Sequence, residues 1–313
     1  MGQYTRTVRG TTICVSNCEE LTVNTSFREN VIEDVFNFSD EKHAFELLEE
    51  KYGKLTKDML ARELIQVGIM PEIFDHDSSE EKLWSKFSDI ILAQSLTFLG
   101  LPSEVLRTRG NSADVYSKSK TYTVVSDAKC FRLSRTAKNQ KDFKIKALDD
   151  WRRQDTYALL VAPLPQYPID RSQIYPQAFL QNVTLLSYFH LQFLIENGMR
   201  GRLEKLWRLP EYIKKNYKVE EQRRGYTYWQ SVDAVICELT KRSTEVLKDY
   251  RRHEIEKIKE IGQEGINYWR SRIESLNKLT REQAVKLLIK AQKIEQKIET
   301  IKRAVEKASE VKI

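Results

Sequence analysis

RGNSADVYSKSKTYTVVSDAK, residues 109–129, is the stretch that decides the fold of this chain. Strand-forming residues fill 113–117 and 121–128, and a three-residue polar stretch, Lys-Ser-Lys, separates the two runs. A short polar connection between two such runs is typical of a β-hairpin. We therefore expect two antiparallel strands here, joined by a short turn.

Three charged residues are expected to converge where this hairpin ends. Side chains alternate between the two faces of a strand, so Asp127 and Lys129 project to the same side. Asp114 lies on the preceding strand, and a short hairpin brings it beside Asp127. Two neighbouring carboxylates repel each other, and a hard divalent cation such as Mg²⁺ relieves the repulsion by binding oxygens of both.

This trio suits the hydrolysis of a phosphodiester. The metal ion polarises the phosphoryl oxygen and lowers the pKa of a bound water. Lys129 orients or helps to deprotonate the attacking water and offsets charge that builds up on the phosphate. An Asp-x-Lys triplet alone is a weak signal, because solvated strand ends often carry charges.

The flanking segments extend the hairpin into an α/β core. Helical spacing of apolar residues precedes it, and Ser78 or Ser79 can cap a helix that begins at Glu80. Two short apolar runs follow, at 157–161 and 183–186, and are typical of buried strands. The pattern predicts a mixed central sheet flanked by helices.

Positive charge gathers directly after the hairpin. The chain of 313 residues has 52 Lys and Arg against 45 Asp and Glu, a net charge of +7. Residues 129–153 alone hold nine cations and three anions. Six of these cations lie on a helix expected from about Thr136 to Arg153, whose Phe143, Ala147 and Trp151 face the core. A basic helix beside a phosphate-hydrolysing site is what a nuclease requires, since cations position the DNA backbone.

We expect three parts along the chain: an N-terminal arm at 1–38, loosely ordered or forming a short strand pair; a catalytic and DNA-recognition core at 39–200; and a helical C-terminal region at 201–313 for packing or dimerisation. Thr280 with Gln283 has the pattern of a capping box. A heptad-like seam follows it, made of Leu287, Ala291, Ile294, Ile298, Ile301 and Val305. Such a seam packs against a helix of the same chain or of a partner subunit, and its length does not choose between them.

Composition excludes several other classes. The four cysteines, Cys14, Cys18, Cys130 and Cys237, are too scattered for a disulfide framework and read as ordinary thiols. No apolar run reaches the length of a membrane span, and the first residues lack the apolar stretch of a signal peptide. We expect a cytoplasmic protein that does not bind membranes.

The sequence resembles the HindIII-type family of type II restriction endonucleases, in the PD-(D/E)xK nuclease superfamily. Asp127-Ala128-Lys129 followed by FRLSRTAKNQKDFK at 131–144 carries the resemblance. RGN at 109–111, EKLWSK at 81–86, QYP at 166–168 and LTREQA at 279–284 extend it through most of the chain. The resemblance implies a homodimeric, Mg²⁺-dependent enzyme of a prokaryotic cytoplasm that cuts both strands of a palindromic duplex and leaves 5′ overhangs. It also implies a partner DNA methyltransferase in the same restriction-modification system.

Carried over from this family, Asp114 takes the place of the first acid of the motif, Asp127 the second acid, and Lys129 the lysine. Ala113 stands where the motif has proline. Nucleases of this fold often add a carboxylate from a helix to the metal site. Glu81 is the candidate here, with Glu80 in reserve, although both also suit the first turn of a helix.

Base recognition maps to the run 136–142 and implies the site AAGCTT. Asn139 can bond an adenine edge, Lys141 can donate to guanine, and Asp142 can accept from cytosine. The remaining DNA contacts expected from this region are a thymine methyl contact by Ala137 and contacts by the cations Arg132, Arg135 and Lys138.

Two other functions remain open at this point. A repair or junction nuclease of the same fold would read DNA shape and would not need the Asn139, Lys141 and Asp142 trio. A non-catalytic DNA-binding helical protein would use the C-terminal seam, and its Asp-x-Lys triplet would be incidental.

Overall fold

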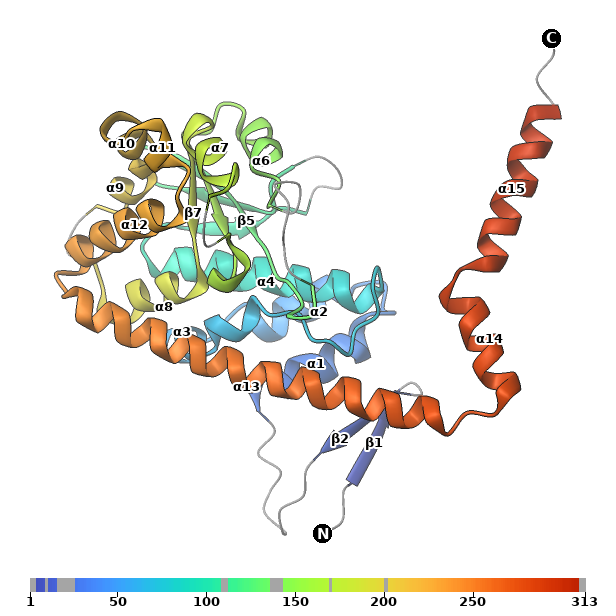
Figure 1. Cartoon of the computed structure of the whole chain (residues 1–313). Coiled ribbons are helices and arrows are strands. Elements are labelled where there is room, and N and C mark those ends of the chain that lie inside the picture. The colour runs from blue at the N-terminus through green and yellow to red at the C-terminus, as the bar shows by residue number, and fades with distance from the viewer. Residues whose placement is uncertain are drawn as a thin grey trace. The chain divides into compact units, whose positions relative to one another are not determined.

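The computed structural model describes residues 4–8, 11–15, 26–107, 112–135, 143–168, 171–199 and 202–309. The chain divides into two compact units, Met1–Gly265 and Ile266–Ile313. The first unit contains a five-stranded sheet and most of the helices (Figure 1).

The sheet is mixed, as expected, with the strand order β3-β4-β5-β6-β7. Its strands are β3 Ser103–Val105, β4 Val115–Lys118, β5 Thr123–Ala128, β6 Tyr157–Val161 and β7 Val183–Leu186. The pairs β3–β4 and β4–β5 are antiparallel, whereas β5–β6 and β6–β7 are parallel. The hairpin prediction is confirmed, and so are the two apolar strands after it, because β6 and β7 are fully buried runs.

Helices cover both faces of this sheet. Helix α4, Ser79–Phe98, packs against β3, β4 and β5, and α6, Ile145–Arg152, and α7, Ile174–Leu180, lie on the opposite side (Figure 1). Ser78 caps α4 by accepting a hydrogen bond from the Glu81 amide at 3.1 Å, which confirms the predicted start of this helix. Trp84 and Phe87 of α4 are buried in the core.

The first residues form a strand pair, β1 Tyr4–Val8 with β2 Thr11–Val15, one of the two options left open for the arm. Three helices follow: α1 Phe27–Phe38, α2 Ala44–Tyr52 and α3 Lys57–Val67. The structure differs from the expected arm over 27–38, because Val31 and Val35 of α1 are fully buried. Their spacing of four residues forms one apolar stripe, and that stripe packs with the core helices.

The basic helix expected over 136–153 is interrupted at Lys144. Residues 136–142 lie outside the described part of the chain, and α6 begins at Ile145 after Lys144, whose φ of 49° is left-handed. Phe143 is buried and Trp151 packs against the core, as expected, but the left-handed Lys144 separates Phe143 from the helix that carries Ala147 and Trp151. The buried residues of α6 are Ile145 and Leu148, and Phe143 is buried from outside the helix.

The remaining elements are helical. They are the single turn η1 Leu164–Gln166 and α8 Tyr188–Asn197, α9 Glu204–Trp207, α10 Leu209–Asn216, α11 Val219–Gln222, α12 Gly225–Thr240, α13 Thr244–Asn277, α14 Arg281–Ala291 and α15 Ile294–Ser309. Thr280 and Gln283 form the predicted capping box at the start of α14. The expected seam is not continuous, because Lys293, with a φ of 53°, separates α14 from α15. None of the described helices is both long and apolar enough to cross a bilayer.

Candidate active site at the end of the hairpin

Asp114 and Asp127 meet at the end of the β4–β5 hairpin. Val115 pairs with Ser126, and Asp114 directly precedes Val115, with its amide donating to the Ser126 carbonyl at 3.2 Å. The two acids lie close enough to interact, because the charge of Asp114 raises the pKa of Asp127. The two side chains differ in exposure, with 31% exposed for Asp114 and 1% for Asp127. The predicted meeting of these two acids at the hairpin end is therefore present.

Lys129 completes the predicted trio. Its ammonium forms an ion pair with Oδ2 of Asp127, and the side chain is only 16% exposed. Two backbone contacts hold the residue: its amide donates to the Val161 carbonyl at 2.7 Å, and its carbonyl accepts from the Tyr188 hydroxyl at 3.0 Å. Burial acts to lower the pKa of Lys129, but the charge and hydrogen bond of Asp127 outweigh it and raise the pKa overall. Lys129 is therefore a protonated cation at neutral pH.

The other oxygen of Asp127 has no partner among the described residues. Within the described residues, no hydrogen-bond donor reaches Oδ1 of Asp127, although this atom is buried. Burial raises the pKa of this carboxyl group, and Asp114 raises it further, whereas Lys129 acts in the opposite direction. A buried carboxylate oxygen without a donor is costly. Such an atom is suited to receive a ligand that brings positive charge.

Helix α4 adds two residues that the sequence reasoning missed. Nζ of Lys86 lies 2.7 Å from Oδ1 of Asp114 and 3.0 Å from Oδ2 of Asp89. Asp89 has a side chain that is 4% exposed, and burial followed by the charge of Asp114 raises its pKa well above the usual value. Asp127 raises it too, so the three acids share one electrostatic site. The available signal was an acid inside the apolar run FSDIILA at 87–93, where a solvated helix face would not be expected.

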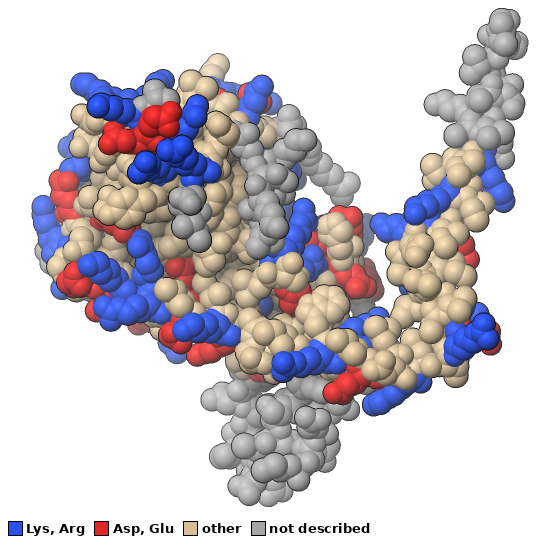
Figure 2. Space-filling view, in the orientation of Figure 1, with Lys and Arg blue, Asp and Glu red and all other residues tan. Residues whose placement is uncertain are grey.

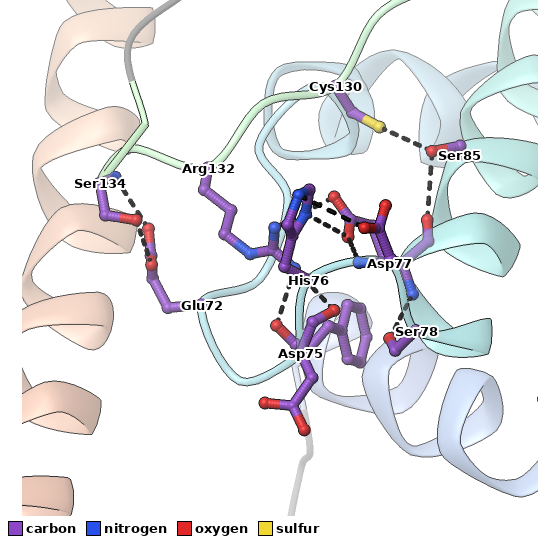
Figure 3. A network of polar contacts seen from close by, with 11 residues as sticks. Glu72, Asp75, His76, Asp77, Ser78, Ser85, Cys130, Arg132 and Ser134 are labelled. Carbon is purple, nitrogen blue, oxygen red and sulfur yellow. Dashed lines mark hydrogen bonds and ion pairs between the residues drawn. The ribbon is translucent and has the colours of Figure 1, made fainter. Parts of the chain in front are cut away.

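Glu81 lies elsewhere on the same helix. It is eight residues before Asp89, which corresponds to about 12 Å along a helix axis. Its carboxylate accepts from the Asp77 amide at 2.6 Å and from Nη1 of Arg132 at 3.0 Å, and lies 3.3 Å from Nδ1 of His76 (Figure 3). The structure therefore does not bring Glu81 to Asp114 and Asp127.

Glu80, the reserve candidate, accepts a hydrogen bond from the Ser39 hydroxyl at 3.1 Å. In the described residues, His76, Asp77 and Glu81 are the one group of three possible ligands whose atoms all lie within 4.8 Å of one another. Two of these side chains are exposed, and Arg132 already balances the charge of Glu81. This group is therefore a weaker metal candidate than the buried acids at the hairpin.

The expected base-reading residues cannot be placed. Ala137, Lys138, Asn139, Lys141 and Asp142 lie outside the described residues, as does the RGN run at 109–111. Arg135 is exposed at the end of the described segment.

Arg132 is described, and its guanidinium points inward. Besides Glu81, it donates to the carbonyls of Phe74 at 2.7 Å and Asp75 at 3.2 Å, and the side chain is 10% exposed. This arrangement leaves Arg132 poorly placed to contact a phosphate.

A mixed sheet between helices, with acids and a lysine gathered at a hairpin end, is consistent with the fold and the site of a restriction endonuclease. The family model of the HindIII restriction endonuclease matches residues 29–305, and the chain belongs to this family of type II restriction endonucleases. A curated relative, the type II restriction enzyme HindIII of Haemophilus influenzae, is 38% identical over 254 residues, which cover 79% of this chain and 84% of the relative. The resemblance expected from the sequence is thereby confirmed, and the chain is a site-specific nuclease.

Proposed function

We propose that this restriction endonuclease makes Mg²⁺-dependent cuts in both strands of unmodified duplex DNA at AAGCTT and leaves 5′ overhangs. The observation that carries the proposal is that Asp114 and Asp127 interact at the hairpin end, with Lys129 bound to Asp127. The unbroken run TAKNQKD at 136–142 and the kinship with HindIII support the site AAGCTT. A methyltransferase that protects the same sequence would accompany the enzyme in a prokaryotic cytoplasm.

The residues at the site fit Mg²⁺, which prefers a few carboxylate oxygens and keeps several waters. Asp127, Asp114 and Asp89 would hold the ion, and the unpartnered Oδ1 of Asp127 is the best donor among them. When bound, the ion supplies Lewis-acid polarisation of the phosphate and a water of lowered pKa. This assignment places Asp89, rather than Glu81, as the carboxylate contributed by a helix.

Lys129 has an electrostatic role in this scheme. Its raised pKa keeps the ammonium protonated, so it stabilises negative charge that develops on the phosphate and orients the attacking water. Removal of a proton from that water by Lys129 would need a neutral amine, which Asp127 disfavours. The contacts of the Lys129 backbone with Val161 and Tyr188 fix where the ammonium stands.

The enzyme acts as a homodimer in this proposal, because a palindrome presents two equivalent scissile bonds and the proposed catalytic trio occurs once in the chain. In the described residues 262–303 no side chain is buried. Large apolar residues of this stretch are exposed instead: Ile266, Trp269, Ile273, Leu276, Val285, Leu288, Ile294, Ile298 and Ile301. Uncharged side chains cover much of the visible surface of α14 (Figure 2). Helices without a core of their own are stable only when a partner covers their apolar face, and a second copy is the partner that a palindrome requires.

One assay separates this proposal from the alternatives. The purified protein is incubated with a plasmid that contains a single AAGCTT, with Mg²⁺ and then with EDTA. Linear DNA with Mg²⁺ alone is the expected result. Scattered nicking would favour a structure-selective nuclease of the same fold, and shifted but intact DNA would favour a non-catalytic DNA-binding protein.

A further inference from the structure

Arg132 fixes the segment just before residues 136–142, the run to which base readout is assigned. This side chain bridges α4 and the loop before it, because it binds the Glu81 carboxylate and the carbonyls of Phe74 and Asp75 (Figure 3). The Arg132 and Glu81 side chains are only 10% and 20% exposed. A partly buried, charge-assisted contact with two further carbonyl acceptors is stronger than a surface ion pair.

Two residues later the same segment is held a second time. Glu72 accepts two hydrogen bonds from Ser134, from its amide at 2.9 Å and from its hydroxyl at 2.6 Å (Figure 3). Glu72 is itself braced by α13, since a Cβ placed on Gly265 would lie 3.0 Å from Cγ of Glu72. One turn earlier, a Cβ on Gly262 would meet only Cδ1 of Leu133, at 3.6 Å. Only the first glycine is therefore needed for the position of Glu72.

Helix α4 connects this anchored segment to the proposed metal site. Glu81, Ser85 and Asp89 follow one another at intervals of four residues and so lie along one face of the helix. Glu81 binds Arg132, the Ser85 hydroxyl lies 3.6 Å from Sγ of Cys130, and Asp89 belongs to the cluster of acids. The chain from the hairpin end to Arg132 is thus held against a single rigid helix.

We propose that Glu72, Glu81, Arg132 and Ser134, here called the recognition clamp, are positioning residues for sequence readout. The clamp fixes where the run 136–142 starts relative to Asp114 and Asp127, so that correct base contacts and correct placement of the phosphate occur together. The inference rests on the proposed function in one respect, the assignment of base readout to residues 136–142. It reassigns Arg132 from a DNA contact, and Glu81 from a metal ligand, to this internal role.

The clamp predicts a loss of selectivity rather than a simple loss of activity. Base contacts discriminate only while donors and acceptors are held in register with the base edges, and a misplacement of about 1 Å can reduce rates by about 100-fold. Weakening the clamp should therefore lower the ratio of cleavage rates at the cognate site and at sites with one altered base pair by at least about 10-fold.

The test uses the full-length protein and two matched pairs of variants. Glu72→Ala removes both acceptors of Ser134, whereas Glu72→Gln retains one carbonyl oxygen. Gly265→Ala requires Glu72 to shift by a few tenths of an ångström without removing a polar group, whereas Gly262→Ala adds the same methyl group to the same helix where space exists. Thermal unfolding of each variant confirms that it folds. The measurements are the selectivity ratio and the hydrogen exchange of the amides at 131–135.

Glu72→Ala and Gly265→Ala should lower the selectivity ratio and speed hydrogen exchange of the Ser134 amide. Glu72→Gln should give values between those of these two variants and the wild type. Gly262→Ala should match the wild type in both measurements. An unchanged ratio and unchanged exchange in folded Glu72→Ala would overturn the inference, as would equal effects of the two alanine substitutions in α13. If the wild type cuts a different hexanucleotide, the proposed recognition sequence AAGCTT is wrong. The selectivity ratio is then measured on the hexanucleotide that the wild type cuts. If the wild type cuts no DNA, the proposed function fails, and slow exchange at Ser134 in Glu72→Ala would refute the clamp separately.

Discussion

The ring of Tyr188 lies directly against Gly68. A Cβ at Gly68 would be only 2.4 Å from Cε2 of Tyr188, so no larger residue fits there unless the ring moves. The hydroxyl of the same ring donates to the Lys129 carbonyl at 3.0 Å. A glycine far from the hairpin in sequence therefore determines how the backbone of Lys129 is supported.

Gly68→Ala should displace Tyr188 and weaken this support. Because overpacking of a full core costs about 1–3 kcal/mol, Tm should fall by several degrees, and kcat should fall at least about 10-fold. Tyr188→Phe is the matched variant, since it keeps the ring and removes only the hydroxyl, and should lower kcat with a smaller change in Tm. Steady-state cleavage kinetics and thermal unfolding check both. Full activity of Tyr188→Phe would show that its hydrogen bond to Lys129 has no role in positioning.

Lys86 balances the charge of two acids of the proposed metal site. Burial acts to lower its pKa, but Asp89 and Asp114 outweigh burial and raise it, so Lys86 remains charged. Lys86→Met leaves both acids without this partner, which should lower Tm in EDTA. A divalent cation would then restore the missing positive charge, so the gain in Tm on adding Mg²⁺ should be larger in the variant than in the wild type. An equal gain in Tm in both proteins would show that Lys86 does not balance the charge of the metal site.

Glu254 of α13 should make stability depend on pH. This carboxyl group is 2% exposed, and burial raises its pKa to about 8, against the opposing effects of the Leu164 amide, Arg251 and Ser187. The folded state thus binds the proton more tightly than the unfolded state, whose carboxyl pKa is about 4.5. The contribution of Glu254 to the free energy of unfolding is greatest below the unfolded-state pKa of about 4.5 and is lost as the pH rises through about 8.

Glu254→Gln removes this titration. The variant should match the wild type in Tm near pH 5 and exceed it by several degrees at pH 9. Glu256→Gln, at an exposed position two residues further along α13, is the control and should give no such difference. Parallel pH profiles for the wild type and Glu254→Gln would contradict the prediction.

The exposed face of α15 is predicted to bind a second copy of the chain. Ile298→Glu places a charge on this face, where Ile298 is 50% exposed, and should weaken the dimer at least about 10-fold in sedimentation experiments. Lys297→Glu introduces the same side chain at the neighbouring position and should leave the dimer intact. The monomeric variant should nick plasmid DNA instead of linearising it. A monomeric wild type with full double-strand cleavage would refute the assignment.

Local pattern was sufficient to predict the hairpin and its trio. Alternating strand residues and a short connection set the register, which pairs Val115 with Ser126 and so brings the neighbouring Asp114 and Asp127 to the same end of the hairpin. The same reasoning predicted the buried strands β6 and β7 and the caps at Ser78 and Thr280, because each depends on neighbours within a few residues.

The features of the fold and the site that the sequence did not predict depend on contacts between segments that are distant in sequence. Lys86 and Asp89 reach the hairpin only because α4 packs on β4 and β5, and no spacing within α4 reveals that. The choice of Glu81 followed a family tendency, whereas its actual partner, Arg132, is 51 residues away. The left-handed backbone at Lys144 likewise interrupts the expected helix, although the apolar spacing continues through it.

Cleavage and binding by Asp127→Asn and Lys129→Ala, measured side by side with the wild type on DNA containing one AAGCTT, test the central claim most directly. Since a group that acts on the reacting phosphate contributes about 10²–10⁴-fold, both variants should lose cleavage by at least that factor in Mg²⁺ while binding the same duplex within a few-fold of the wild type. Retained cleavage by either variant, or a loss of binding as large as the loss of cleavage, would contradict the account.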